Sequence, residues 1–206
     1  MTFGDMLQAL YDRLGLTGET DLAVRLINNG KDRYETARKW PFLETSTTQL
    51  FTSGTRTYLA PSNCRHILSI EGPSGLPLDS EVERETYDAL YRADTSTATV
   101  PTVYREQGTR QTDGSIYFQV WPNPSTNTSG TIRFLQHVPD LSSADTASSY
   151  YAIPSAHHFA ILEFAEASFH EYEDSQQAQF LYSKALDSVN RLAGSDVEGL
   201  PMQENN

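Results

Sequence analysis

Residues 33–61 read RYETARKWPFLETSTTQLFTSGTRTYLAP, and the hydrophobic pattern changes within this stretch. Before Pro41, apolar residues recur at helical spacing up to Trp40, and a helix usually ends before a proline. From Thr45 onward the chain is rich in threonine and aromatic residues, and Gly54 separates two short runs that are typical of strands joined by a turn. The stretch therefore predicts a change from helical to β structure.

Helices are predicted on both sides of this point. The N-terminal pair covers residues 1–44, with Gly15 closing the first helix and Asn28-Asn29-Gly30 as a weak spot that bends or breaks the second. The C-terminal pair begins near Pro154, which suits the first turn of a helix, and ends near Gly194, a plausible C-cap residue.

The central segment, residues 45–149, is predicted to be β-rich and to contain a polar helix at 80–94. Its candidate strands are 46–51, 56–60, 65–70, 101–106, 115–121 and 130–137. The fold class is therefore α+β: a helical bundle formed by residues 1–44 and 150–194, with a central antiparallel, sandwich- or barrel-like β-rich insertion. Residues 195–206 are polar and without periodicity, which predicts a flexible C-terminal tail.

Charge excludes several classes of function. The 206 residues include 27 acidic and 15 basic ones, for a formal net charge of −12. Such an excess of acid disfavours a classical nucleic-acid binder and docking on an anionic membrane, and no signal peptide or membrane span is readable. The single cysteine, Cys64, excludes an internal disulfide and a cysteine-based zinc site. The segment 163–206 holds nine acidic residues against two basic ones, so it contributes −7 of the total.

No catalytic motif of the nucleophile-elbow, phosphate-loop or zinc-protease kind is present. The strongest candidate for chemistry is the segment HHFAILEFAEASFHEYED, which contains His157, His158, Glu163, Glu166 and His170. Glu166 and His170 are four residues apart and share a helical face, so they could hold one metal ion. A di-iron bundle instead needs Glu-x-x-His pairs from two helices, whereas here the spacing is Glu-x-x-x-His and the last helix has no histidine. The alternative is a solvated acidic face. We expect no cofactor and no catalytic residues, and we keep a metal-dependent enzyme as the alternative.

Four degenerate motifs follow one another along the chain. They are carried by Arg38, Trp40, Phe42 and Leu43; by Gly54, Tyr58, Leu59 and Pro61; by Tyr117, Trp121, Pro122 and Pro124; and by Thr131 and Ile132. Their order and spacing over roughly residues 20–190 resemble the adaptor, or head–tail connector, proteins of tailed bacteriophages. Ala60 precedes the proline of the second motif as an insertion, and His137 or Phe134 stands where the fourth motif usually has tyrosine.

The resemblance implies a structural virion protein and not an enzyme. Such adaptors form a ring, usually of twelve copies, beneath the capsid portal in the phage neck, and they are assembled in the host cytoplasm. The ring extends the channel through which genomic double-stranded DNA passes without specific binding, and it docks the tail, a stopper or a nozzle protein. The alternative within phage biology is another neck or tail component, a stopper or tail-completion protein. The structural or interface residues implied by the motifs are Arg38, Trp40, Phe42, Tyr58, Trp121 and Pro122.

Two further hypotheses concern the acidic C-terminal part. The first is that acidic residues of the closing helices face the lumen of the ring and repel DNA, since like charges disfavour adhesion. These residues are Glu163, Glu166, Glu171, Glu173 and Asp174. The second is that the apolar residues of the polar tail, Leu200, Pro201 and Met202, dock on the portal, the alternative being an unstructured terminus.

Overall fold

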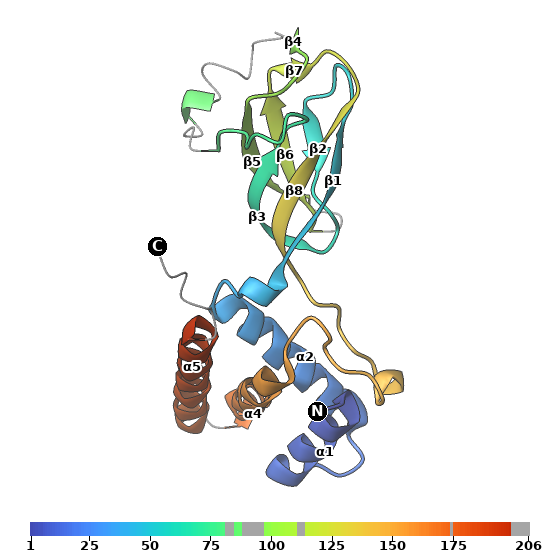
Figure 1. Cartoon of the computed structure of the whole chain (residues 1–206). Coiled ribbons are helices and arrows are strands. Elements are labelled where there is room, and N and C mark those ends of the chain that lie inside the picture. Colours follow the sequence, from blue (N-terminus) through green and yellow to red (C-terminus); the bar gives the residue numbers. More distant parts are fainter. Residues whose placement is uncertain (81–84, 88–96, 111–113, 174, 199–206) are drawn as a thin grey trace. The chain divides into compact units, whose positions relative to one another are not determined.

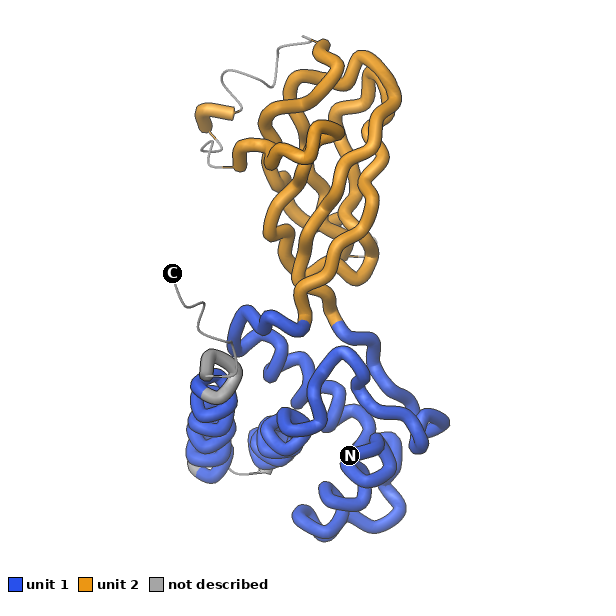
Figure 2. The backbone as a smooth tube through the Cα atoms, in the orientation of Figure 1, with its two compact units in different colours: residues 1–42, 138–206 blue, residues 43–137 orange. Residues whose placement is uncertain are grey.

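Figure 1 shows the computed structural model of the chain, which describes residues 1–80, 85–87, 97–110, 114–173 and 175–198. The protein is mixed α and β, with antiparallel sheets, as the sequence predicts. It divides into two compact units, shown in Figure 2: residues 1–42 with 138–206 form unit 1, and residues 43–137 form unit 2. The polar helix predicted at 80–94 lies mostly outside the described residues.

Unit 1 combines helices from both ends of the chain. Its helices are α1 (Phe3–Leu14), α2 (Thr20–Ala37), α4 (His158–Glu173) and α5 (Ser175–Glu198), with 3-10 turns at Ser143–Asp145 and Ser155–His157. Helix α4 packs against both α2 and α5, and α1 packs against α2 and α4. Residues 138–149, which the sequence pattern groups with the β-rich segment, belong to unit 1.

The ends of α1 follow directly from local chemistry. The hydroxyl of Thr2 accepts a hydrogen bond from Asp5 N (3.1 Å), and the Asp5 carboxylate accepts one from Thr2 N (2.8 Å), which completes a capping box. At the other end the N–H of Gly15 donates to Tyr11 O (2.9 Å), so Gly15 closes the helix as predicted.

The predicted break in α2 is wrong, since the helix runs unbroken from Thr20 to Ala37. Gly30 is instead the point where α2 crosses α4. A Cβ atom there would lie 2.4 Å from Ile161 O and 2.8 Å from Ala165 N, so only glycine lets the two backbones approach this closely. The packing against α4 outweighs the poor helix propensity of the glycine.

The C-terminal helices also differ from prediction at their ends. Helix α4 begins at His158, after the 3-10 turn that follows Pro154. Helix α5 continues past Gly194 to Glu198, so Gly194 is not a C-cap and residues 195–198 are helical, although they were expected to be tail. Residues 199–206 lie outside the described part of the chain.

Unit 2 contains two three-stranded antiparallel sheets and one short parallel pair. Its strands are β1 (Glu44–Phe51), β2 (Thr57–Leu59), β3 (Cys64–Glu71), β4 (Thr97–Ala98), β5 (Val103–Thr109), β6 (Ile116–Trp121), β7 (Asn123–Pro124) and β8 (Thr128–Gln136). The sheet orders are β1-β8-β3, β2-β6-β5 and β4-β7. All six predicted strands are present, with boundaries shifted by a few residues.

The core of unit 2 is drawn from both three-stranded sheets. The first contributes Phe51, Ile67 and Phe134, and the second contributes Tyr58 and Phe118. In β6 the buried residues alternate with half-buried ones, whereas in β3 they are three residues apart, because two register shifts interrupt its pairing with β8. Each unit therefore has its own hydrophobic core.

Candidate functional site

The aromatic motif of unit 1 is a buried junction. Trp40 stacks on Tyr34 and Phe42, with ring centroids 4.7 and 5.4 Å away, and its indole N–H donates to Tyr34 O at 3.0 Å. The guanidinium of Arg38 lies 5.8 Å from the centre of the Trp40 ring. His157 meets Tyr34, Trp40 and Phe42 edge-on and hydrogen-bonds through Nδ1 to the Tyr34 hydroxyl. The motif thus ties the end of α2 to the start of α4.

The motif residues of unit 2 are also structural. The Tyr58 hydroxyl donates to Thr55 O (2.8 Å) and accepts from Thr52 N (3.1 Å), so it holds the turn between β1 and β2. Its ring packs against Phe51 and Phe118 in the core. Trp121 ends β6 and is half-buried, as is Pro122 after it. Burial of these side chains agrees with a role in core packing.

The three described carboxylates of α4 that were predicted to line a channel are paired within unit 1. Glu166 accepts from Arg13 of α1 (3.2 Å), and Glu171 accepts two hydrogen bonds from Arg33 of α2 (2.7 and 2.6 Å). The Arg33 hydrogen bonds hold the pKa of Glu171 below its usual range.

The third carboxylate, Glu163, is buried and lies 3.5 Å from Lys184 Nζ of α5. The three carboxylates thus point toward three different helices. The side chain of Glu173 and all of Asp174 lie outside the described residues.

The histidines of the same segment have structural partners. The ring nitrogens of His158 lie 3.1 Å from Met1 O and from Ile153 O, and burial lowers the pKa of this histidine. His170 packs its ring edge-on against Phe169. Among the described residues, none of the five candidates joins a group of three possible metal ligands. With Glu166 also paired to Arg13, the alternative of a metal site on this helix has no support among these residues.

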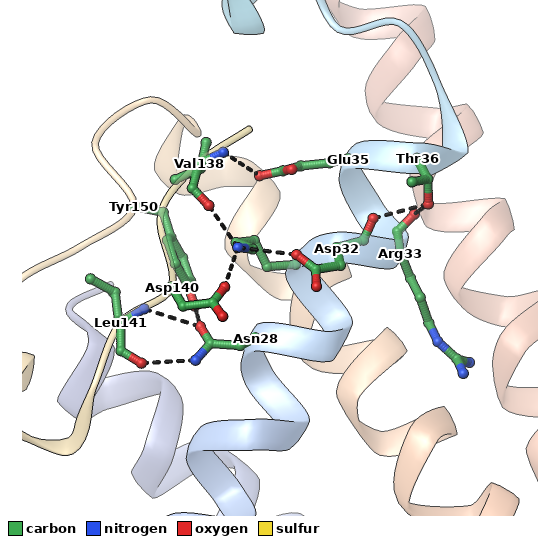
Figure 3. A network of polar contacts seen from close by, with 10 residues as sticks. Asn28, Asp32, Arg33, Glu35, Thr36, Val138, Asp140, Leu141 and Tyr150 are labelled. Carbon is green, nitrogen blue, oxygen red and sulfur yellow. Dashed lines mark hydrogen bonds and ion pairs between the residues drawn. The ribbon is translucent and has the colours of Figure 1, made fainter. Parts of the chain in front are cut away.

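The most extensive polar cluster of unit 1 was not predicted from the sequence. Figure 3 shows it on the face of α2 that meets the segment 138–150. The side chain of Lys31 is fully buried, and its ammonium donates to Val138 O (2.6 Å) and to the Asp140 carboxylate (2.5 Å). Asp32 lies 3.1 Å from the same ammonium. The positive charge is therefore matched by a carbonyl and two carboxylates.

Two other residues of α2 bind the backbone of the same segment. The Asn28 amide donates to Leu141 O (2.8 Å) and accepts from Leu141 N (3.2 Å), as a neighbouring strand would. Glu35 accepts from Val138 N at 3.1 Å. The Tyr150 hydroxyl donates to Asn28, and burial, followed by the nearby carboxylates, raises the pKa of this tyrosine.

We call Asn28, Lys31 and Glu35 the α2 clasp. The spacings of three and four residues place all three on one helical face. Polar residues on one face of a helix normally indicate a face exposed to water, so nothing in the sequence distinguishes the clasp from such a face.

Several apolar side chains of unit 1 remain exposed. They are Tyr151, Phe159, Phe180 and Tyr182, of which Tyr151 (85%) and Phe180 (69%) are the most exposed. A groove of about 560 Å³ between α4 and α5 is lined by Glu171, Ala178, Gln179, Tyr182 and Ser183. A smaller one of about 260 Å³ lies on α2, lined by Leu22, Arg25, Leu26 and Asn29. Exposed apolar side chains beside grooves are typical of protein-binding surfaces.

The lone cysteine does not resemble a nucleophile. Cys64 is buried in unit 2, and burial, aided by Glu106, raises its pKa to about 12. A thiol needs a lowered pKa to react at neutral pH, so this one behaves as a small apolar side chain.

Comparison with known protein families gives a match to one family model. A family model described as "SU10 adaptor protein" matches residues 1–203. A search of curated proteins gives no match. In the described part of the chain no helix combines the length and apolar character that crossing a bilayer requires. Leu200, Pro201 and Met202, predicted to dock on the portal, lie outside the described residues.

Proposed function

Since this chain belongs to the SU10 adaptor protein family, a family of phage head–tail adaptors, we propose that it forms a ring beneath the capsid portal. The ring extends the DNA channel and gives the tail, a stopper or a nozzle protein its docking surface. The observation that carries this proposal is that the family match spans both compact units, residues 1–203 of 206. Family membership makes the protein a structural component of the virion, associated with other head or tail proteins.

The arrangement of side chains supports a structural role. The polar groups concentrated on α2 and α4 pair with partners inside unit 1, and the motif aromatics Trp40 and Tyr58 lie in the two cores. Apolar side chains and grooves are what the described surface offers to partners. These features suit a structural protein that contacts neighbouring proteins in an assembly.

The channel proposal rests on net charge. A ring of twelve copies with −12 each would carry on the order of 140 negative charges, which disfavours adhesion of DNA phosphates. The pairing of Glu163, Glu166 and Glu171 with basic residues weakens their share of this field. We therefore propose that the net acidity of the ring, rather than one row of α4 carboxylates, keeps DNA moving. Detectable binding of short duplex DNA by the purified protein at physiological salt would contradict this.

The position beneath the portal is tested by imaging. The full-length chain is mixed with the portal protein of its own phage and examined by electron microscopy. We expect a ring with a central hole, stacked on the portal at the site where DNA leaves. A chain that never associates with the portal, although both proteins are folded, would contradict the proposal.

The C-terminal residues are proposed to make part of the portal contact. Deleting residues 199–206 removes Leu200, Pro201 and Met202 while keeping all of α5. We expect weaker binding to the portal with unchanged thermal stability, measured by co-sedimentation and by circular dichroism. Undiminished binding of the deletion variant would remove this part of the proposal and leave the rest in place.

A further inference from the structure

Helix α5 has one packed face and one open face. Its buried residues are Ala178, Leu181, Ala185, Ser188, Val189 and Ala193, all directed toward the rest of unit 1. Phe180 lies on the opposite face and is 69% exposed. Asp187 follows two turns later on that same open face, about 10 Å along the helix axis. A large aromatic side chain surrounded by polar ones is typical of the centre of a protein interface.

Helix α2 carries a groove into which a protruding aromatic side chain such as Phe180 could fit. Leu22, Arg25, Leu26 and Asn29 line about 260 Å³ on one helical face, since they follow one another at spacings of three, four and seven residues. The two leucines give the groove an apolar floor, and the exposed Arg25 lies beside it. The groove is thus suited to an aromatic side chain with an acidic neighbour.

Each surface offers one charged side chain to a partner, since the other basic residues of the α5 face, Lys184 and Arg191, contact Glu163 and Ser188. Arg25 and Asp187 are both exposed, and neither takes part in an ion pair among the described residues. Other charged residues of unit 1, such as Arg13 and Glu171, are paired internally. Phe180 with Asp187 on one copy, and the leucine-lined groove with Arg25 on another, could therefore form a specific contact through apolar burial and an ion pair.

The two surfaces belong to different helices of unit 1. Figure 1 shows α4 between α5 and the N-terminal half of α2. When the α5 surface of one copy meets the α2 surface of the next, the contact repeats head to tail, and it closes into a ring when the rotation permits. A twofold pair, in which two copies exchange both surfaces with each other, would instead end at a dimer.

We propose that the occupant of the α2 groove is Phe180 of the neighbouring copy of this chain, with Asp187 of that copy facing Arg25. This inference rests on the proposed ring and names the surfaces that form it. Phe180 supplies the buried apolar anchor, and the Arg25–Asp187 pair fixes the register between copies.

The test is a charge exchange in the full-length protein, with ring formation on the portal followed by electron microscopy and sedimentation. Asp187→Arg and Arg25→Asp should each raise the concentration needed for a ring by about tenfold or more, and so should Phe180→Ala. Combining Asp187→Arg with Arg25→Asp should restore assembly, because the pair is re-formed with its signs exchanged. Leu50→Ala is the control, since it removes an exposed apolar side chain of unit 2 and should leave assembly unchanged.

A cross-linking experiment tests proximity directly. With Leu22→Cys and Phe180→Cys in one chain, oxidation should give a ladder of covalent multimers, because each copy links to the next. The native Cys64 is buried, so we expect it to form few disulfides under these oxidising conditions. Unchanged assembly of Phe180→Ala and Asp187→Arg, or no recovery in the exchanged pair, would overturn the inference and leave the ring itself standing. A wild-type chain that never assembles on the portal would overturn both the ring and this interface.

Discussion

At the residue scale, Gly30 shows how one side chain, or its absence, sets the distance between two helices. Gly30→Ala places a Cβ atom 2.4 Å from Ile161 O, so α2 must move away from α4. We expect a loss of about 1–3 kcal/mol in the free energy of unfolding, measured by urea denaturation. Gly194→Ala is the matched control: a Cβ there meets nothing within 4 Å, and the change should be neutral or stabilise α5 by up to about 1 kcal/mol. Equal effects of the two substitutions would refute the crossing argument.

A second residue-scale prediction concerns pH. Burial lowers the pKa of His158 below the usual histidine value of 6.5, so the unfolded chain binds a proton more readily than the folded one. Stability should therefore fall as the pH drops through 6.5 toward the folded-state pKa, by about 1.4 kcal/mol per unit of difference between the two pKa values. Urea denaturation between pH 7.5 and 5.5 measures this loss.

The variant comparison assigns the pH effect to one imidazole. His158→Gln should reduce the pH dependence over this range. His170→Gln, which removes an imidazole from the same helix, should keep the wild-type slope. If His158→Gln retained the full slope, another group would be responsible.

At the element scale, the α2 clasp binds an otherwise irregular segment to a helix. Lys31→Met removes the buried ammonium and leaves Val138 O and two carboxylates without their shared partner. We expect a loss of about 1–3 kcal/mol in the free energy of unfolding, mainly from the buried Val138 carbonyl, because both carboxylates remain exposed to water. Lys39→Met changes an exposed lysine and should cost less than about 0.5 kcal/mol.

Hydrogen exchange gives an independent reading of the same prediction. The amides of Val138 and Leu141 donate to Glu35 and Asn28, so both should exchange faster in the Lys31→Met protein. Unchanged protection of these amides, together with unchanged stability, would show that the clasp does not hold the segment.

The elements that could be predicted from sequence are those with a local signal. Strand β6 alternates in burial along its length, and α1 carries its capping pair next to the apolar stripe. The docking of residues 138–150 could not be predicted, because it depends on Asn28 and Lys31, polar residues that ordinarily lie on the surface. Local propensity likewise predicted a break at Gly30, where tertiary packing keeps the helix continuous.

The candidate site shows the same limit. The excess of acidic residues on α4 is readable from the sequence, and so are the motif aromatics. The partners of Glu166 and Glu171 are Arg13 and Arg33, which lie more than a hundred residues away in the chain. Sequence periodicity reports which face of a helix a residue occupies, but not which other helix meets that face.

At the scale of the whole molecule, each unit has its own core and one of the two tryptophans. Trp40 is buried in unit 1, and Trp121 is half-buried in unit 2. Since domains with separate cores can unfold separately, a change in one core should affect the tryptophan of that unit alone. Gly130→Ala is a suitable change in unit 2, because its Cβ atom would lie 2.0 Å from Glu71 O across the β3–β8 pair.

The measurement is urea unfolding followed by fluorescence in Trp121→Phe, where Trp40 is the single reporter. There, Gly130→Ala should leave the midpoint of the Trp40 transition unchanged, and Gly30→Ala should lower it. In the Trp40→Phe protein, where Trp121 reports, Gly130→Ala should lower the midpoint. If Gly130→Ala moved the Trp40 transition as far as the Trp121 transition, the two units would unfold as one cooperative body. Independent transitions would instead show that each unit unfolds by itself. A partner that binds one unit would then raise the unfolding midpoint of that unit and not of the other, because binding stabilises only the folded state that the partner recognises.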